Sequence, residues 1–135
     1  MSAIVVDPSP WVPEGVYLLR YVGYEMTQYW GHKKLAVHFA IVEGEYAGTP
    51  LTRYYNVKKR VTDRFAVVRE HRALFPDESD DNLIDPDRYA GHLIRAKVET
   101  TRKNGIGKEL TEASRYSVVR ELLEIVPDDY VPIES

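Results

Sequence analysis

Aromatic and basic residues are concentrated in one short segment of the chain, Tyr29-Trp30-Gly31-His32-Lys33-Lys34. Exposed aromatic rings stack on nucleic-acid bases and lysine side chains neutralise phosphates, so this mixture suits a polynucleotide surface. The segment alone leaves a second interpretation open, in which Trp30 folds back and plugs the mouth of a barrel. Its role therefore depends on the elements that flank it.

A second basic segment surrounds a predicted hairpin turn at Asn104-Gly105 and contains Arg102, Lys103 and Lys108. Its two glycines leave backbone amides accessible, so the segment can fold over a ligand. Lys58-Lys59-Arg60 precedes a predicted helix and either extends a path for phosphates or forms a solvated linker. Strand residues between these segments complete the predicted nucleic-acid surface: Arg53, Tyr54, Arg95 and Lys97.

The sequence carries no legible catalytic or metal-binding pattern. The histidines lack the spacing of a metal site, and the glycines near Lys108 lack the length of a phosphate-binding loop. Asp77-x-Ser79-x-Asp81 begins like a calcium loop, but Asn82 and Arg88 stand where that loop needs glycine and glutamate. We therefore predict that the protein is not an enzyme and takes no metal or cofactor.

Composition is typical of a single soluble domain. The chain has 135 residues, of which 44% are hydrophobic and 29% charged, enough to bury a core of its own. It has no cysteine, which fits a reducing compartment. No apolar run approaches the ~20 residues of a membrane span, and the N-terminus has no basic region. We predict a cytoplasmic protein without a membrane partner.

The distribution of charge matters more than its sum. A net charge of −3 argues against a polyanion as partner. However, acidic residues crowd positions 77–87 and the tail, whereas 53–72 and 95–120 are rich in lysine and arginine. A basic face on an acidic protein is therefore possible.

Alternating apolar residues predict three strands in the first half of the chain, at 15–26, 35–41 and 51–58. Gly23 lies within the first strand and predicts a bulge or bend. In the second strand, Leu35, Val37, Phe39 and Ile41 share one face. In the third, Arg53 and Tyr54 fall on opposite faces, and the pattern does not decide which faces inward.

The second half predicts a helix that begins at Thr62 or Asp63 and runs to about residue 75, with a short helical turn capped by Asp85. A fourth strand at 92–103 and a fifth at 110–116 follow. Ser117 is expected to cap a last helix at 118–126, which Pro127 ends. Residues 15–126 form the predicted domain.

The two ends of the chain are expected to lie outside this domain. Residues 1–14 form a proline-rich, extended lead-in, in which Trp11 is expected to cover the core. Residues 127–135 form an acidic, flexible tail that either recruits replication or recombination proteins, occupies the basic groove when nucleic acid is absent, or has no functional role.

The order of the predicted elements, which is three strands, a helix and two strands, predicts a mainly β fold. The first strand is expected to bend. The arrangement is that of an OB-like five-stranded Greek-key barrel, with a helix between strands three and four and a C-terminal helix added. In that fold the loops after strands one and four flank an oligonucleotide site. Here those loops are the two basic segments.

Several short motifs resemble a group of small phage and mobile-element proteins that are similar to OB-fold single-stranded DNA-binding proteins. The residues are Gly15-x-Tyr17-x-Leu19, Phe39-x-Ile41-Val42-Glu43-Gly44-Glu45-Tyr46-Ala47-Gly48, Leu51 with Tyr54-Tyr55-Asn56, and more weakly Tyr116-Ser117-Val118-Val119. The resemblance covers residues 13–60. It implies a replication or recombination accessory that coats single strands.

We therefore expect the protein to bind single-stranded DNA, or RNA, with little sequence preference, either as a monomer or as a homo-oligomer. The alternative is a protein-interaction module, such as a phage-borne inhibitor or an assembly subunit, in which the aromatic-basic segment is a hot spot. The net negative charge favours this alternative. Salt dependence separates the two, because phosphate binding weakens steeply with salt and an apolar hot spot does not.

Overall fold

The computed structural model describes residues 11–29, 32–57, 66–76, 85–101, 115–127 and 130. For residues 27–29, 32 and 57 it describes the backbone alone. The elements, in chain order, are β1 (Gly15–Tyr29), β2 (His32–Ile41), β3 (Pro50–Val57), α1 (Ala66–Leu74), the 3₁₀ turn η1 (Pro86–Tyr89), β4 (Leu93–Thr101) and β5 (Tyr116–Ile125). None of the helices in these ranges is long and apolar enough to cross a membrane.

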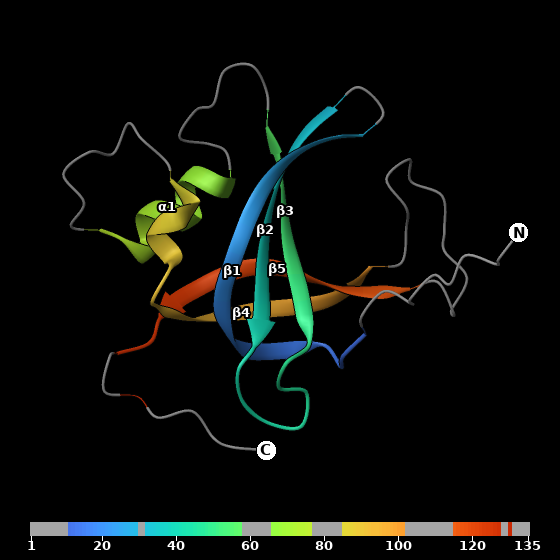
Figure 1. Ribbon diagram of the computed structural model, residues 1–135, viewed down its shortest axis with the longest axis vertical. Coiled ribbons are helices and arrows are strands. Elements are labelled where there is room, and N and C mark those ends of the chain that lie inside the picture. The colour runs from blue at the N-terminus through green and yellow to red at the C-terminus, as the bar shows by residue number, and fades with distance from the viewer. Residues whose placement is uncertain are drawn as a thin grey trace, which may run out of the picture.

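The five strands form one antiparallel sheet in the order β3-β2-β1-β4-β5, which confirms the mainly β prediction. β1 is the central strand, and Figure 1 shows it curving strongly across the molecule. It pairs with β4 from Gly15 to Arg20 and with β2 from Leu19 to Tyr29. The register shifts between Tyr21 and Gly23, so the bulge predicted at Gly23 is confirmed.

Curvature brings the two outer strands, β3 and β5, against each other, although the hydrogen-bonded sheet is not closed into a barrel. Helix α1 packs against β5 at this place. It follows β3 and precedes β4, as the sequence predicts, and its first described residue is Ala66. The predicted start at residues 62–63 lies outside the described residues.

The core fills the concave side of the sheet. On β2, Leu35, Val37, Phe39 and Ile41 are all buried, which confirms the predicted alternation. The same alternation on β4 buries Ile94, Ala96 and Val98. At the end covered by α1 and η1, the ring of Tyr89 contacts the rings of Tyr21, Phe39 and Phe75, with centroids about 6 Å apart. Burying so much aromatic surface at this end fixes η1 on β1.

Local sequence accounts for the turn between β2 and β3 and for the cap of η1. Gly44 and Gly48 have φ angles of 81° and 90°, values that favour glycine, and they reverse the chain between β2 and β3. Between them, Tyr46 packs edge-on against Tyr17. Asp85 caps η1 by accepting a hydrogen bond from the backbone amide of Asp87.

The predicted C-terminal helix is wrong, because residues 116–125 form strand β5. Val119, Leu122 and Ile125 lie opposite Val98, Ala96 and Ile94, and the register skips Arg120 and Leu123. The two register shifts turn the two-residue period of a strand into a three-residue spacing, which resembles one face of a helix. The predicted fifth strand therefore lies too early in the sequence, and residues 110–114 of it lie outside the described residues.

The predictions for Ser117 and Trp11 are also wrong. Ser117 caps no helix; it lies buried in β5, where its hydroxyl accepts a hydrogen bond from the amide of Val12 and donates one to the carbonyl of the same residue, at 2.8 and 3.0 Å. Val12, and not Trp11, fills the core, and 56% of Trp11 is exposed. A serine that satisfies both backbone groups of Val12 makes its burial possible.

Part of the predicted tail lies against the sheet. Just before the tail, Val126 donates a backbone hydrogen bond to Leu93; within the tail, the hydroxyl of Tyr130 donates a hydrogen bond of 2.6 Å to Glu43. The guanidinium of Arg95 lies over the Tyr130 ring. Residues 1–10 of the lead-in, and 128, 129 and 131–135 of the tail, lie outside the described residues.

Candidate nucleic-acid interface

One face of β1–β2–β3 points away from the core. Because residues directly opposite each other in a sheet share a face, the register assigns its members. Lys34 lies opposite Asn56, Ala36 lies between Glu25 and Tyr54, and His38 lies opposite Thr52. We call this set the outer face: Glu25, Lys34, Ala36, His38, Thr52, Tyr54 and Asn56.

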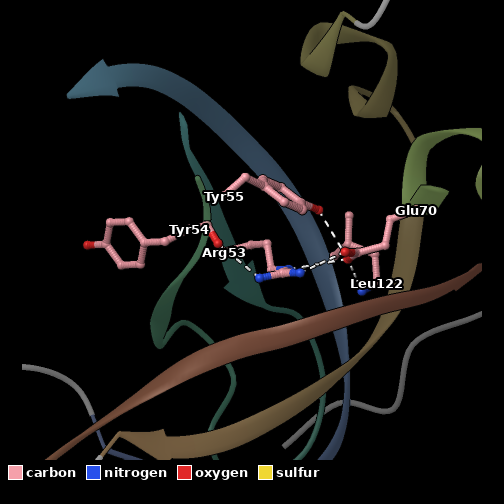
Figure 2. Close-up of polar contacts among 5 residues, drawn as sticks. All are labelled: Arg53, Tyr54, Tyr55, Glu70 and Leu122. Carbon is pink, nitrogen blue, oxygen red and sulfur yellow. Dashed lines mark hydrogen bonds and ion pairs between the residues drawn. The ribbon is translucent and has the colours of Figure 1, made fainter. Parts of the chain in front are cut away.

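Tyr54 is the large aromatic side chain of the outer face, with 38% of its surface exposed. Figure 2 shows its ring pointing away from the side chains of Arg53 and Tyr55, which turn toward the core. This alternation resolves the ambiguity of the third strand. A fixed, partly exposed ring is suited to stacking against a flat ligand.

Basic and amide groups lie beside Tyr54 near the β1–β2 connection. Lys34 and Asn56 form the neighbouring cross-strand pair on the same face, and Lys33 is exposed on the opposite face of β2. The backbones of Tyr29 and His32 pair at the ends of β1 and β2. The predicted turn is therefore shorter than its six residues suggest, since four of them belong to strands.

A polar chain occupies the centre of the outer face. His38 is held from both ring nitrogens, by Thr52 Oγ1 at 2.9 Å from Nδ1 and by Glu25 Oε1 at 3.1 Å from Nε2. Glu25 is well exposed, with 61% of its side chain accessible. The outer face thus combines a cation, an aromatic ring and an oriented carboxylate.

Arg53, which the sequence assigns to the surface, points inward and binds Glu70 of α1 (Figure 2). Its Nη2 and Nε donate hydrogen bonds of 2.7 and 3.2 Å to the two carboxylate oxygens, and its guanidinium lies over the Tyr55 ring. Burial alone would lower the pKa of Arg53, but the hydrogen bonds to Glu70 and the nearby Tyr55 and Glu70 groups together outweigh it and raise that pKa. With its donors engaged, this guanidinium has a structural role.

Arg95 and Lys97 are separated from Tyr54 along β1. They pair with Leu18 and Val16 near the start of β1, whereas the cross-strand row that contains Tyr54 includes Glu25. Both are engaged with glutamates. Arg95 contacts Glu124 at 3.1 Å, and Lys97 contacts Glu99 at 3.3 Å.

Glu99 also contacts Arg120, at 2.9 Å. Its hydrogen bonds to Lys97 and Arg120 lower the pKa of Glu99. The outward side of β4–β5 is therefore a ladder of alternating charges and not a basic surface.

The structure thus brings Lys34 and Tyr54 together and separates them from Arg53, Arg95 and Lys97. Glu25, His38 and Asn56 join the site although they are not among the residues predicted for it. For Asn56 the alternation with Tyr54 was an available signal, whereas Glu25 and His38 needed the register. Seven predicted site residues lie outside the described residues: Trp30, Lys58, Lys59, Arg60, Arg102, Lys103 and Lys108.

Within the described ranges, no group of three or more His, Asp or Glu side chains is placed to hold a metal ion. Comparison with family models, with curated proteins and with solved structures found no match to this chain.

Proposed function

We propose that the protein binds single-stranded DNA on the outer face, and that its sheet is an OB-like Greek-key barrel. The strand order supports the second part, since β3-β2-β1-β4-β5 with β3 lying against β5 is the order in which an OB barrel closes. The bulged central strand β1 and the helix between β3 and β4 are further features of that fold. In OB folds the face of strands two and three receives the oligonucleotide.

The observation that carries the proposal is the shared face of Lys34, Tyr54 and Asn56 on β2 and β3. A base stacked on Tyr54 gains roughly 1–3 kcal/mol whatever its identity, because every base has a π-face. Lys34 lies one row away, where it neutralises a phosphate of the same strand. Asn56 offers both a donor and an acceptor to the sugar or base.

Stacking and phosphate contacts together give affinity with little sequence preference. The resemblance of residues 13–60 to phage and mobile-element proteins suggests the setting, which is the coating of single strands during replication or recombination. Of the remaining predicted basic residues, Lys58, Lys59 and Arg60 follow β3 in the sequence, and Arg102, Lys103 and Lys108 follow β4. The ladder of alternating charges on β4–β5 would stay outside the contact.

Fluorescence anisotropy with labelled oligonucleotides tests the proposal. Oligo-dT and a duplex of the same length are titrated with protein at low and at high salt. We expect single strands to bind more tightly than duplex, with affinity falling steeply as salt rises. No binding of oligo-dT at tens of micromolar protein and low salt would exclude the function. An RNA oligonucleotide in the same titration decides between the two nucleic acids.

A protein-interaction role is the second candidate, and it has its own observation. Tyr24 and Met26 lie opposite the core residues Val37 and Leu35, yet both are well exposed. They belong to the half of β1 beyond Arg20, which β4 does not pair. A partner strand or helix covering this apolar stretch would bind with little dependence on salt, which distinguishes it from DNA binding.

A further inference from the structure

A carboxylate stands in the middle of the outer face, where a purely electrostatic DNA surface would have none. Glu25 and Tyr54 lie in one cross-strand row, on either side of Ala36. Neighbouring strands are about 4.8 Å apart, so the backbones of the two residues are separated by about 10 Å. Ala36 between them carries only a methyl group and is 1% exposed, whereas Tyr54 is 38% exposed, so a base that stacks on Tyr54 would lie above Ala36 and could present its edge to Glu25.

The carboxylate of Glu25 is oriented by its neighbours. Thr52 holds His38, and His38 contacts Oε1 of Glu25 at 3.1 Å. In the described part of the chain, Oε2 has no hydrogen-bond partner, and each oxygen of an ionised carboxylate accepts up to two hydrogen bonds. An exposed acceptor held in this way repels phosphate and attracts hydrogen-bond donors, so it faces a base and not the backbone.

We propose that Glu25 gives this site a preference for guanine at one base position. This inference rests on the proposed DNA binding and refines it. The free Watson–Crick edge of guanine has two adjacent donors, N1–H and the 2-amino group, which match the two oxygens of a carboxylate. Cytosine and adenine offer one amino group beside an acceptor nitrogen. The single N3–H donor of thymine lies between two carbonyl oxygens, which repel the carboxylate.

The division of labour on the outer face follows from these contacts. Tyr54 supplies stacking that any base satisfies, and Lys34, in the adjacent row, holds the backbone. Glu25 weakens binding of a strand that offers no donor and strengthens binding of one that offers two. The preference therefore lies on top of a sequence-independent affinity and concerns the base beside Tyr54.

Competition anisotropy measures the preference directly. Strands of about 15 nucleotides, a length of the order one OB fold covers, carry either thymine alone or thymine alternating with guanine, adenine or cytosine. A lithium buffer prevents guanine quadruplexes. We expect the guanine strand to bind about tenfold more tightly than oligo-dT. Replacing each guanine by inosine, which lacks the 2-amino group, should remove most of that gain without any change to the protein.

Glu25→Gln is the decisive variant, because it keeps the size of the side chain and removes its charge. We expect oligo-dT to bind as well as or better than before, and the guanine-to-thymine ratio to fall to about two or less. Glu124→Gln is the matched control: its side chain is 62% exposed, near the other end of β1, and the ratio should stay unchanged.

The outcomes separate the two proposals. If all strands bind equally to the unaltered protein, or if Glu25→Gln leaves the ratio unchanged, the guanine preference is wrong and DNA binding stands. If no strand binds, both proposals fall. A far-ultraviolet circular dichroism spectrum confirms that each variant is folded.

Discussion

Glu70 on α1 accepts a hydrogen bond of 2.7 Å from the backbone amide of Leu122 on β5 (Figure 2). The same carboxylate binds Arg53 and the hydroxyl of Tyr55 on β3. One side chain from a helix thus connects the two outer strands of the sheet where they do not pair with each other. It also satisfies an amide at the edge of β5 that would otherwise be buried without a partner.

We predict that Glu70→Ala lowers the free energy of unfolding by about 3–5 kcal/mol, because it leaves the charge of Arg53 buried and unpaired. Adding Arg53→Met should recover part of the loss, since the orphaned charge is then gone. Arg69→Ala, at the neighbouring exposed position of α1, is the control and should change stability by no more than about 0.5 kcal/mol. Urea unfolding measures all three. Equal losses for Glu70→Ala and Arg69→Ala would show that the connection between β3 and β5 contributes nothing.

A second prediction concerns alkaline pH. Burial raises the pKa of Tyr55 and of Tyr89, and burial with a hydrogen bond to Asp87 raises that of Tyr21. In the unfolded chain these hydroxyls titrate near pH ~10. Their contribution to stability is therefore complete below about pH 10 and is lost above it, because the unfolded state releases protons that the folded state keeps.

The loss should reach about 1.4 kcal/mol per pH unit for each of the three tyrosines. Urea midpoints measured from about pH 9 to about pH 11 test this, with tyrosinate absorbance followed in parallel. Tyr21→Phe should reduce the loss of stability per pH unit by the contribution of one tyrosine. A midpoint that does not change across this range would contradict the prediction.

Ser117 provides the third prediction, which concerns the docking of the N-terminal segment. Ser117→Ala removes the hydroxyl that satisfies both backbone groups of the buried Val12. We expect a loss of about 1–3 kcal/mol, the cost of leaving a buried donor without a partner. Trp11→Ala, one residue away and exposed, should change stability by less than about 0.5 kcal/mol. If Ser117→Ala and Trp11→Ala lose the same free energy of unfolding, the hydrogen bonds between Ser117 and Val12 do not contribute to stability.

The sequence predicts best where one strand has one buried face. On β2 the apolar residues alternate strictly, and on β4 they do so between charged residues, so both strands were placed correctly. β5 failed for a physical reason: the register shifts at Arg120 and Leu123 change the period of burial from two to three. Bulges depend on the partner strand, and a local pattern does not contain them.

The candidate site was predictable only in part for a similar reason. Tyr54 and Lys34 were selected as residue types that bind nucleic acid, and the register then brought them together. Glu25 and His38 are ordinary polar residues in the sequence, and only the pairing of β1 with β2 puts them beside Tyr54. Arg53 was misplaced because the third strand has polar residues on both faces, and its direction is set by Glu70, 17 positions later.

The fourth prediction tests the aromatic contact of the outer face. Tyr54→Ala should weaken oligo-dT binding by roughly 1–3 kcal/mol, whereas Tyr54→Phe, which keeps the ring, should bind nearly as well. Leu123→Ala on β5 removes an exposed apolar side chain from another strand and should leave affinity unchanged. Anisotropy at fixed low salt measures the three variants. A loss shared by Tyr54→Phe would point to the hydroxyl, and no loss in Tyr54→Ala would remove this residue from the site.

The last prediction compares two lysines that the sequence treats alike. Lys34 lies on the outer face beside Asn56, whereas Lys97 lies near the start of β1 and contacts Glu99 at 3.3 Å. A lysine that neutralises one phosphate releases about one counterion, so Lys34→Ala should reduce the slope of log affinity against log salt by about 1. Lys97→Ala removes the same charge from the protein and should leave the slope unchanged. Because net charge is identical in the two variants, equal slopes would mean that DNA responds to the overall field of the protein and not to the outer face.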